Sequence, residues 1–66
     1  MKTSIAQLRK ERKLTQEELA KAVGVSRQTI ISIENERYTA SLVLAYKIAH
    51  YFGKTIEEVF DFSEEE

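Results

Sequence analysis

The sequence predicts an all-α domain of five helices, and three observations carry this prediction. Its 66 residues suffice for one small domain, which we place at residues 1–66. The chain has no cysteine and one histidine, so neither disulfides nor a structural zinc site with four nitrogen or sulfur ligands can stabilise it. It has no proline either, and apolar residues recur at helical spacing between capping residues. Regular helices, a partner subunit or both are left to stabilise so small a fold.

A first helix is predicted from about Ser4 to Arg12, with Ile5 and Leu8 on its apolar side. Thr15–Glu18 is a capping box, in which threonine and glutamate side chains each accept a hydrogen bond from the other residue's backbone amide. It opens a second helix, which ends at Gly24 because glycine adopts the left-handed conformation without steric cost.

Ser26 caps a third helix that runs to about Asn35, and a fourth begins at Ser41 and ends at Phe52, before Gly53. Apolar residues lie almost all round the fourth helix. This pattern predicts that the fourth helix is the central one.

A second capping box, Thr55–Glu58, opens a short fifth helix. Residues 60–62 alternate apolar and acidic side chains as a strand does, so a short terminal β-ribbon is an alternative to coil there. Residues 61–66 form the tail, and we expect the charge run Glu64–Glu66 to be a solvated, frayed end.

The composition is that of a folded, soluble protein, with 42% hydrophobic and 32% charged residues. No apolar run approaches the roughly 20 residues that span a bilayer, and residues 1–10 lack the apolar core of a secretion signal. We therefore expect a cytoplasmic protein without a membrane partner, a metal or a cofactor.

The net charge of -1 is the sum of a positively charged first part of the chain and a negatively charged second part. Residues 1–30 carry seven basic and three acidic side chains, a net charge of +4, whereas residues 31–66 carry three basic and eight acidic ones, a net charge of -5. The positively charged first part can bind phosphate groups. The alternative is that the charges belong to ordinary solvent-exposed helix faces and are divided in this way without a binding role.

Residues 16–35 have the spacing of a helix-turn-helix, in which two helices are joined by a tight turn. The inward positions suit this motif, with a small residue where the helices cross, a glycine at the bend and apolar residues behind it: Ala20, Gly24, Val25, Ile30 and Ile33. This combination after a capping box is specific to the motif.

The third helix has a polar side opposite Ile30 and Ile33, because successive residues are about 100° apart. A recognition helix enters the major groove of DNA and reaches base edges from such a side. Arginine can bind guanine and glutamine can bind adenine through two hydrogen bonds, and serine can bind either a base or a phosphate. We predict base contacts by Arg27, Gln28 and Ser32, with ordinary surface residues as the alternative.

Two further residues of this helix need an explanation. Ile31 lies towards the outward side, where it either touches a thymine methyl group or sugar or seals the rim of the helix. Glu34 lies only about 40° from Ile30, so its carboxylate tips towards the core and requires a partner. Arg9 is the candidate partner.

These residues resemble the Xre/Cro-type helix-turn-helix regulators, which include phage repressors, over about residues 5 to 60. The most specific stretches are Leu14–Ala20 and Val23–Ile30. Within the family, the chain is most similar to the short single-domain repressors that include the cytolysin repressor. The resemblance implies a phage-repressor-like fold, binding to operators as symmetric dimers, and no enzymatic activity.

The resemblance also implies roles for individual residues. It places Arg27, Gln28 and Ser32 at the bases and makes Arg9 and Glu34 an inner ion pair. It implies that six residues contact backbone phosphates: Gln16, Ser26, Thr29, Asn35, Arg37 and Tyr38.

The chain departs from the family in one loop. Glu36 stands where glycine or asparagine usually ends the recognition helix, and Thr39–Ala40 stand where Asn-Pro is frequent. A left-handed glutamate would cost on the order of 1 kcal/mol and would place negative charge near phosphate.

The apolar residues of the last two helices exceed what one small core readily uses. A single module this small makes few base contacts, and pairing two modules sets two recognition helices about 34 Å apart. We therefore predict a homodimer with a self-complementary interface, and core packing within one chain is the alternative for the same residues. The predicted interface comprises Leu44, Ile48, Ile56, Val59 and Phe60.

The sequence thus predicts a transcriptional repressor that binds a pseudo-palindromic operator in double-stranded DNA, and is nucleoid-associated while bound. A protein-binding module of the antitoxin or adaptor type, with secondary DNA contact, is the alternative that acidic residues 57–66 favour. No catalytic site is expected, because His50 has neither a cysteine nor an evident serine partner.

Overall fold

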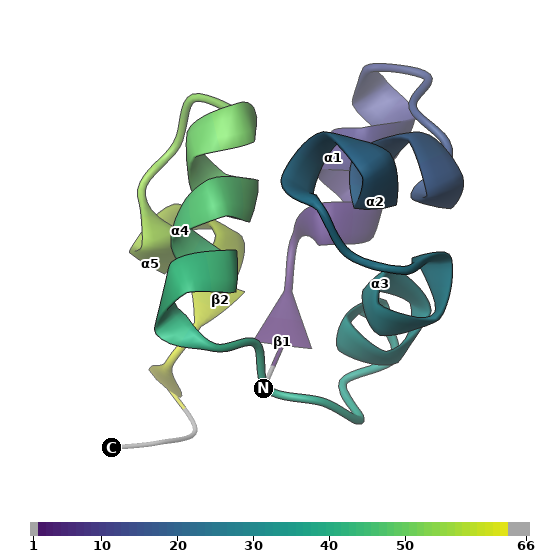
Figure 1. Ribbon diagram of the computed structural model, residues 1–66. Helices are drawn as coiled ribbons and strands as arrows, with labels where there is room; N and C mark the ends of the chain where they lie inside the picture. Colours follow the sequence, from purple (N-terminus) through teal and green to yellow (C-terminus); the bar gives the residue numbers. More distant parts are fainter. Residues whose placement is uncertain (1, 64–66) are drawn as a thin grey trace.

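Five short helices and a two-stranded ribbon make up residues 2–63, the part of the chain that this computed structural model describes (Figure 1). All five predicted helices are confirmed, with ends close to those expected. Glu64–Glu66, predicted to be a solvated end, lie outside the described residues. The elements in chain order are β1 (Lys2–Thr3), α1 (Ile5–Glu11), α2 (Gln16–Val23), α3 (Arg27–Glu34), α4 (Leu42–Tyr51), α5 (Ile56–Val59) and β2 (Phe60–Asp61).

Side-chain caps mark where four of the described helices begin, α2 to α5. At the start of α2, the Thr15 hydroxyl accepts from the Glu18 amide at 3.0 Å, and the Glu18 carboxylate accepts from the Thr15 amide at 2.9 Å. The same reciprocal pair opens α5 at Thr55. The hydroxyls of Ser26 and Ser41 each accept a hydrogen bond from an amide in the first turn of α3 or α4. Each cap satisfies an amide that has no partner within its own helix.

Residues in the left-handed conformation follow the first four helices. Gly24 follows α2 and Gly53 follows α4, as predicted, with φ angles of 78° and 68°. Glu36 follows α3 with φ of 63°, so the departure from glycine or asparagine noted in the sequence places a left-handed glutamate at this turn. Lys13 follows α1 with φ of 55°, a conformation that no glycine in the sequence indicates at this position.

The terminal ribbon joins the two ends of the described chain. β1 pairs antiparallel with β2, with Lys2 opposite Asp61. The Ser4 amide donates to the Val59 carbonyl at 2.8 Å and so continues the connection towards α5. The β2 strand is the ribbon that residues 60–62 allowed, but its partner β1 was not predicted, because two residues are too short to show an alternating pattern.

The core lies between two halves of the molecule, α1–α3 on one side and α4 with α5 on the other (Figure 1). As predicted, α4 is central: it packs against both α2 and α5. None of the helices in the described chain has the length and apolar character needed to cross a bilayer. The largest fully buried side chains are those of Ile5, Leu19, Ile30, Ile33, Ile48 and Val59.

Four of the five residues predicted to form a dimer interface lie in the core of this single chain. Leu44 is 8% exposed, and Ile48, Val59 and Phe60 are at most 2% exposed. The alternative of core packing therefore applies to these four side chains. The reason is that α5 folds back onto α4 and β2 pairs with β1, which together carry Val59 and Phe60 inward. Ile56 is half-buried at the edge of the core.

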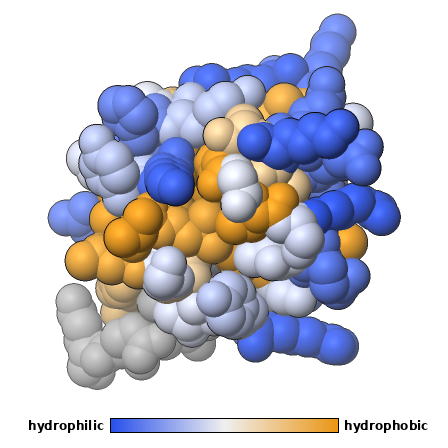
Figure 2. Space-filling model, viewed as in Figure 1, coloured by the Kyte–Doolittle hydropathy of each residue, from blue (hydrophilic) through white to orange (hydrophobic). Residues whose placement is uncertain are grey.

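Other apolar side chains take the outward positions of α4. Leu42 is 77% exposed, Val43 is 65% exposed and Tyr46 is 57% exposed. Figure 2 shows hydrophobic surface gathered over α4 and the middle of the same face. Because α4 is apolar on almost all sides, the apolar side that carries Leu42, Val43 and Tyr46 remains exposed in this chain.

Candidate nucleic-acid interface

The packing of α2 against α3 determines which side of α3 faces outward. Ala20 and Val23 of α2 are buried, as are Ile30 and Ile33 of α3. The amide of Val25, in the turn, donates to the Ala20 carbonyl at 2.9 Å and holds the bend closed. With the two isoleucines directed inward, the polar side chains of α3 are left on the surface.

Five of the predicted contact residues share one surface of the molecule. They line a hollow of about 230 Å³ formed by the amino end of α3 and the loop that follows it. Arg27 lies at the same end of α3 and is exposed. The residues lining the hollow are Ser26, Gln28, Thr29, Ser32 and Tyr38.

The hydroxyls of Ser26 and Thr29 form a pair at the start of α3. Their oxygens lie 3.0 Å apart, and the Ser26 oxygen also accepts from the Thr29 amide at 3.2 Å. Two hydroxyls carry two hydrogens, and only one is needed between them. One hydroxyl hydrogen of the pair is therefore available to an acceptor such as a phosphate oxygen.

The carboxyl end of α3 turns sharply and exposes three charged or polar side chains. The Glu36 amide donates to the Ile33 carbonyl at 3.0 Å, and the Arg37 amide donates to the Ser32 carbonyl at 2.9 Å. These two bonds form the hydrogen-bond pattern that terminates helices through a left-handed residue. Asn35, Glu36 and Arg37 are exposed around this turn. Ile31, whose role the sequence left open, is half-buried.

A partly buried ion pair links α1 to α3. The Arg9 guanidinium donates to the two carboxylate oxygens of Glu34 at 2.9 and 3.2 Å, and the two side chains are 14% and 7% exposed. This is the pair that the Glu34 position indicated. Gln16 was predicted to contact phosphate, but its Nε2 atom also donates to Glu34, at 3.1 Å. No local sequence pattern indicates that contact, because 18 positions separate the two residues.

Arg12, one of the basic residues counted in 1–30, has a structural role that the sequence did not indicate. Its guanidinium donates to the carbonyls of Tyr51 and Phe52 at 3.3 and 2.9 Å and lies 5.1 Å from the centre of the Phe52 ring. It thus places a positive charge at the carboxyl end of α4, where the helix dipole is negative. Arg9 binds Glu34 and Arg12 binds the end of α4, so two of the seven basic residues in 1–30 have structural contacts and five take part in neither. They are Lys2, Lys10, Lys13, Lys21 and Arg27, and all five are exposed.

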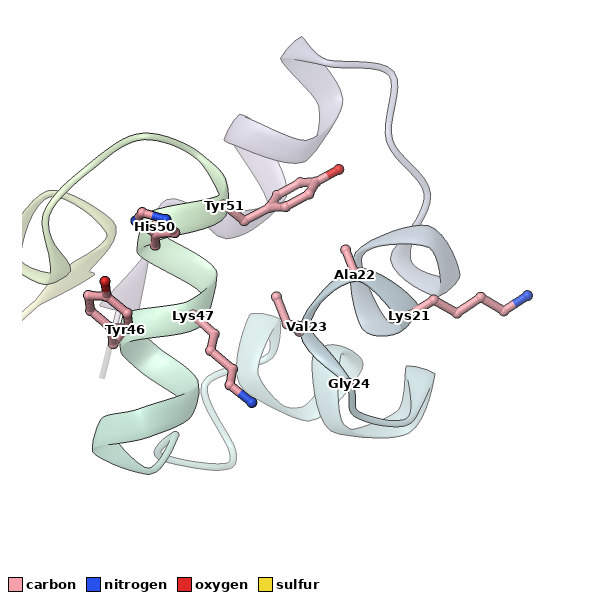
Figure 3. A pocket seen from close by; sticks show the side chains of 8 residues that line it. All are labelled: Lys21, Ala22, Val23, Gly24, Tyr46, Lys47, His50 and Tyr51. Carbon is pink, nitrogen blue, oxygen red and sulfur yellow. The ribbon is translucent and has the colours of Figure 1, made fainter.

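A second hollow, of about 440 Å³, lies between the end of α2 and α4 (Figure 3). His50 is exposed there, and its ring stacks on Tyr46 with 5.4 Å between the ring centres. The Lys21 side chain points away from α4, and Tyr51 points towards α1. These polar groups do not converge on a common point, as the groups of a catalytic site must.

Comparison with known proteins agrees with this geometry. The helix-turn-helix family pattern matches residues 5–59 of the chain. The whole chain is 53% identical to an HTH-type transcriptional regulator of Archaeoglobus fulgidus, of which it covers 93%. It is 36% identical over 62 residues to the phage transcriptional repressor RstR of Vibrio cholerae, a match that covers 94% of this chain and 56% of that protein. The crystal structure of the restriction-modification controller protein C.AhdI from Aeromonas hydrophila superposes with a TM-score of 0.77, at 30% identity and 85% coverage of each chain.

Proposed function

The chain belongs to the helix-turn-helix family of the Xre/Cro type and is a transcriptional regulator rather than an enzyme, and we propose that it represses transcription by binding a pseudo-palindromic operator as a homodimer. The observation that carries this proposal is the outward side of α3. There, exposed Arg27 lies at the amino end of α3 beside a hollow that Gln28 lines together with four residues carrying hydroxyl groups. These are side chains that read base edges and hold phosphates.

The proposed contacts divide according to chemistry. Arg27 binds guanine, Gln28 binds adenine, and Ser32 reaches a base edge one turn further along α3. The available hydroxyl hydrogen of the Ser26 and Thr29 pair binds a phosphate oxygen. The remaining phosphate contacts come from Gln16 at the start of α2 and from Asn35, Arg37 and Tyr38 after α3.

A second copy of this chain is the proposed partner of the uncovered apolar surface. Leu42, Ile56 and Phe62 line a hollow of about 200 Å³, and the exposed Val43 and Tyr46 lie along the same helix as Leu42. This surface replaces the predicted interface and retains only Ile56 from it.

The dimensions of the molecule suit such a dimer. α4 and α5 occupy the half of the molecule away from α3 in Figure 1, so pairing through them leaves both α3 helices uncovered. One chain measures 32 × 22 × 19 Å. Two copies side by side can therefore present their recognition helices about 34 Å apart, the length of one turn of DNA. Occupation of a promoter by this dimer would block RNA polymerase, which is the proposed mechanism of repression.

The proposal is tested by selecting bound sequences from random duplex DNA with the native chain and with Arg27→Ala and Gln28→Ala. The native chain should enrich an inverted repeat with half-sites about one turn apart. Each variant should lose preference at its own position and bind the native site more weakly by roughly fivefold to 150-fold for each half-site, the equivalent of about 1 to 3 kcal/mol per lost base contact.

Lys54→Ala is the matched control, because it removes an exposed positive charge between α4 and α5. It should leave the selected sequence unchanged. Binding should weaken steeply as salt rises, because phosphate contacts release counterions. If the native chain enriches no sequence at low salt, the proposal is wrong and the protein-binding alternative is favoured.

A further inference from the structure

Glu34 lies at the end of α3 and accepts hydrogen bonds from two other elements. Its Oε2 accepts from the Nε of Arg9 at 2.9 Å. Its Oε1 accepts from the Nη2 of Arg9 at 3.2 Å and from the Nε2 of Gln16 at 3.1 Å. Arg9 also donates through Nη1 to the Leu14 carbonyl at 3.0 Å, in the loop that precedes Gln16. The carboxylate therefore joins α1, the start of α2 and the end of α3.

The chemistry of a carboxylate decides which way the Gln16 amide faces. An ionised carboxylate only accepts hydrogen bonds, so the nitrogen of the amide must face Glu34 and the amide oxygen cannot. The Nε2 group carries two hydrogens, and Glu34 uses one of them. The second N–H remains available to another acceptor. Without Glu34, the amide could rotate and present its oxygen to a phosphate, which accepts hydrogen bonds but donates none.

We propose that Glu34 is a positioning residue for DNA binding, which orients the Gln16 amide so that its second N–H donates to a backbone phosphate. This inference rests on the proposed function, because it assigns the orientation of one proposed phosphate contact. Arg9 acts one step further back, since it holds both oxygens of the carboxylate in place. The Gln16 side chain is thus ordered before DNA arrives, and binding does not have to order it.

The size of the effect follows from that ordering. Immobilising one flexible side chain on binding typically weakens affinity by roughly two- to tenfold. A contact whose side chain is already ordered does not carry this cost. The contribution of Gln16 to DNA affinity should therefore depend on Glu34, even though Glu34 faces the protein interior.

The test is a double-mutant cycle with Gln16→Ala and Glu34→Gln, scored by the Kd for the selected operator. Glu34→Gln preserves the size of the side chain and an acceptor for Arg9, but its amide can face Gln16 with either nitrogen or oxygen. Gln16→Ala should raise the Kd roughly two- to tenfold in the native background and less than about twofold in the Glu34→Gln background. An equal factor in both backgrounds would overturn the inference, because a purely structural Glu34 weakens binding without changing what Gln16 contributes.

Tyr38→Phe supplies the matched cycle. It removes another proposed phosphate contact, and Tyr38 makes no hydrogen bond to Glu34 within the described residues. Its effect on the Kd should be the same with Glu34 or glutamine at position 34. Coupling of equal size in this cycle would show that Glu34 acts through the whole fold, and would also overturn the inference.

A measurement on the native chain does not depend on how the variants fold. The side-chain amide of Gln16 should show a rigid heteronuclear NOE in the absence of DNA, whereas the exposed Gln28 should show a mobile one. Equal mobility of the two amides would overturn the inference. If the native chain binds no operator, the proposed function fails. If it binds one and Gln16→Ala has no effect, only the present inference fails.

Discussion

Two residues other than glycine adopt the left-handed backbone conformation, which is usually found at glycine. Lys13 and Glu36 have positive φ angles at the ends of α1 and α3, where Gly24 and Gly53 serve the same purpose at the ends of α2 and α4. The left-handed conformation places the Cβ atom too close to the following carbonyl oxygen and costs roughly 1 to 2 kcal/mol in a residue other than glycine. The hydrogen bonds of Glu36 and Arg37 back to α3 maintain it nonetheless.

Replacing Glu36 with glycine should raise the free energy of unfolding by about 1 kcal/mol, because the strain disappears while both backbone hydrogen bonds remain. Urea denaturation of native chain and variant measures this difference. Asn35→Gly is the control one residue earlier, where φ is -84° and glycine offers no relief. It should be neutral or destabilising, and a gain equal to that of Glu36→Gly would contradict the explanation.

At the scale of single elements, the helices of this chain are too short to form by themselves. They contain four to ten residues, and isolated helices below about 12 to 15 residues are marginal in water. Caps compensate in part, and they also perturb acid-base equilibria. Hydrogen bonds from the backbone and side chain of Thr15 lower the pKa of Glu18 from its usual 4.5, and those of Thr55 lower the pKa of Glu58 in the same way.

These lowered pKa values predict a loss of stability in acid. A carboxyl group with a lower pKa in the folded chain than in the unfolded one stabilises the fold above its usual pKa of 4.5. That contribution is lost as the pH falls through the lowered folded value. In the double variant Glu18→Gln and Glu58→Gln, glutamine retains the cap but does not titrate. Its free energy of unfolding should fall less steeply below pH 4.5 than that of the native chain.

Thermal denaturation from pH 7 to pH 2.5 measures the two slopes. Some acid dependence should persist in the variant, because the amide and hydroxyl of Ser63 also lower the pKa of Asp61. Identical slopes in native chain and variant would show that the caps do not contribute to acid sensitivity.

For the molecule as a whole, a single small core must hold all five described helices together. Ile48 of the central helix α4 is completely buried, and so are Ile5 and Ile30 from the other half of the molecule. A domain of this size is stabilised by only about 3 to 10 kcal/mol in total. Each large core side chain therefore accounts for a substantial part of the stability.

Ile48→Ala should lower the free energy of unfolding by about 2 to 5 kcal/mol, since it removes buried methyl groups and leaves a cavity. Chemical denaturation followed by circular dichroism checks this value. Ile48→Val, which removes one methylene group, should cost about 0.5 to 1.5 kcal/mol. If the alanine variant is as stable as the native chain, the central position of Ile48 is wrong.

The proposed dimer is also a property of the whole molecule. Leu42→Glu should raise the dimer dissociation constant roughly tenfold or more, because it places a charge in the apolar surface that two copies would bury. Sedimentation equilibrium over a range of concentrations measures this constant. Gln7→Glu introduces the same charge on the exposed side of α1 and should leave it unchanged. A native chain that remains monomeric at all concentrations would rule out this interface.

The sequence by itself determined the helices, the turn and the polar side of α3. Their signals are local: the capping boxes at Thr15 and Thr55 each lie within four residues, and the periodicity around Ile30 and Ile33 lies within one helix. The candidate contact residues Arg27, Gln28 and Ser32 follow from that periodicity and from side-chain chemistry. The need for a partner at Glu34 also followed, because its carboxylate is directed inward, and the candidate Arg9 is the residue that the structure places there.

Only the tertiary structure decided which apolar residues of the last two helices are buried and which groups Arg12 and Gln16 contact. Arg12 contacts Phe52 across 40 positions, and Gln16 contacts Glu34 across 18. The same applies to Leu42 and Val59, which share an apolar character in the sequence but differ completely in exposure. No local pattern contains this information, because the free energy of burial depends on what the rest of the chain brings into contact with each side chain.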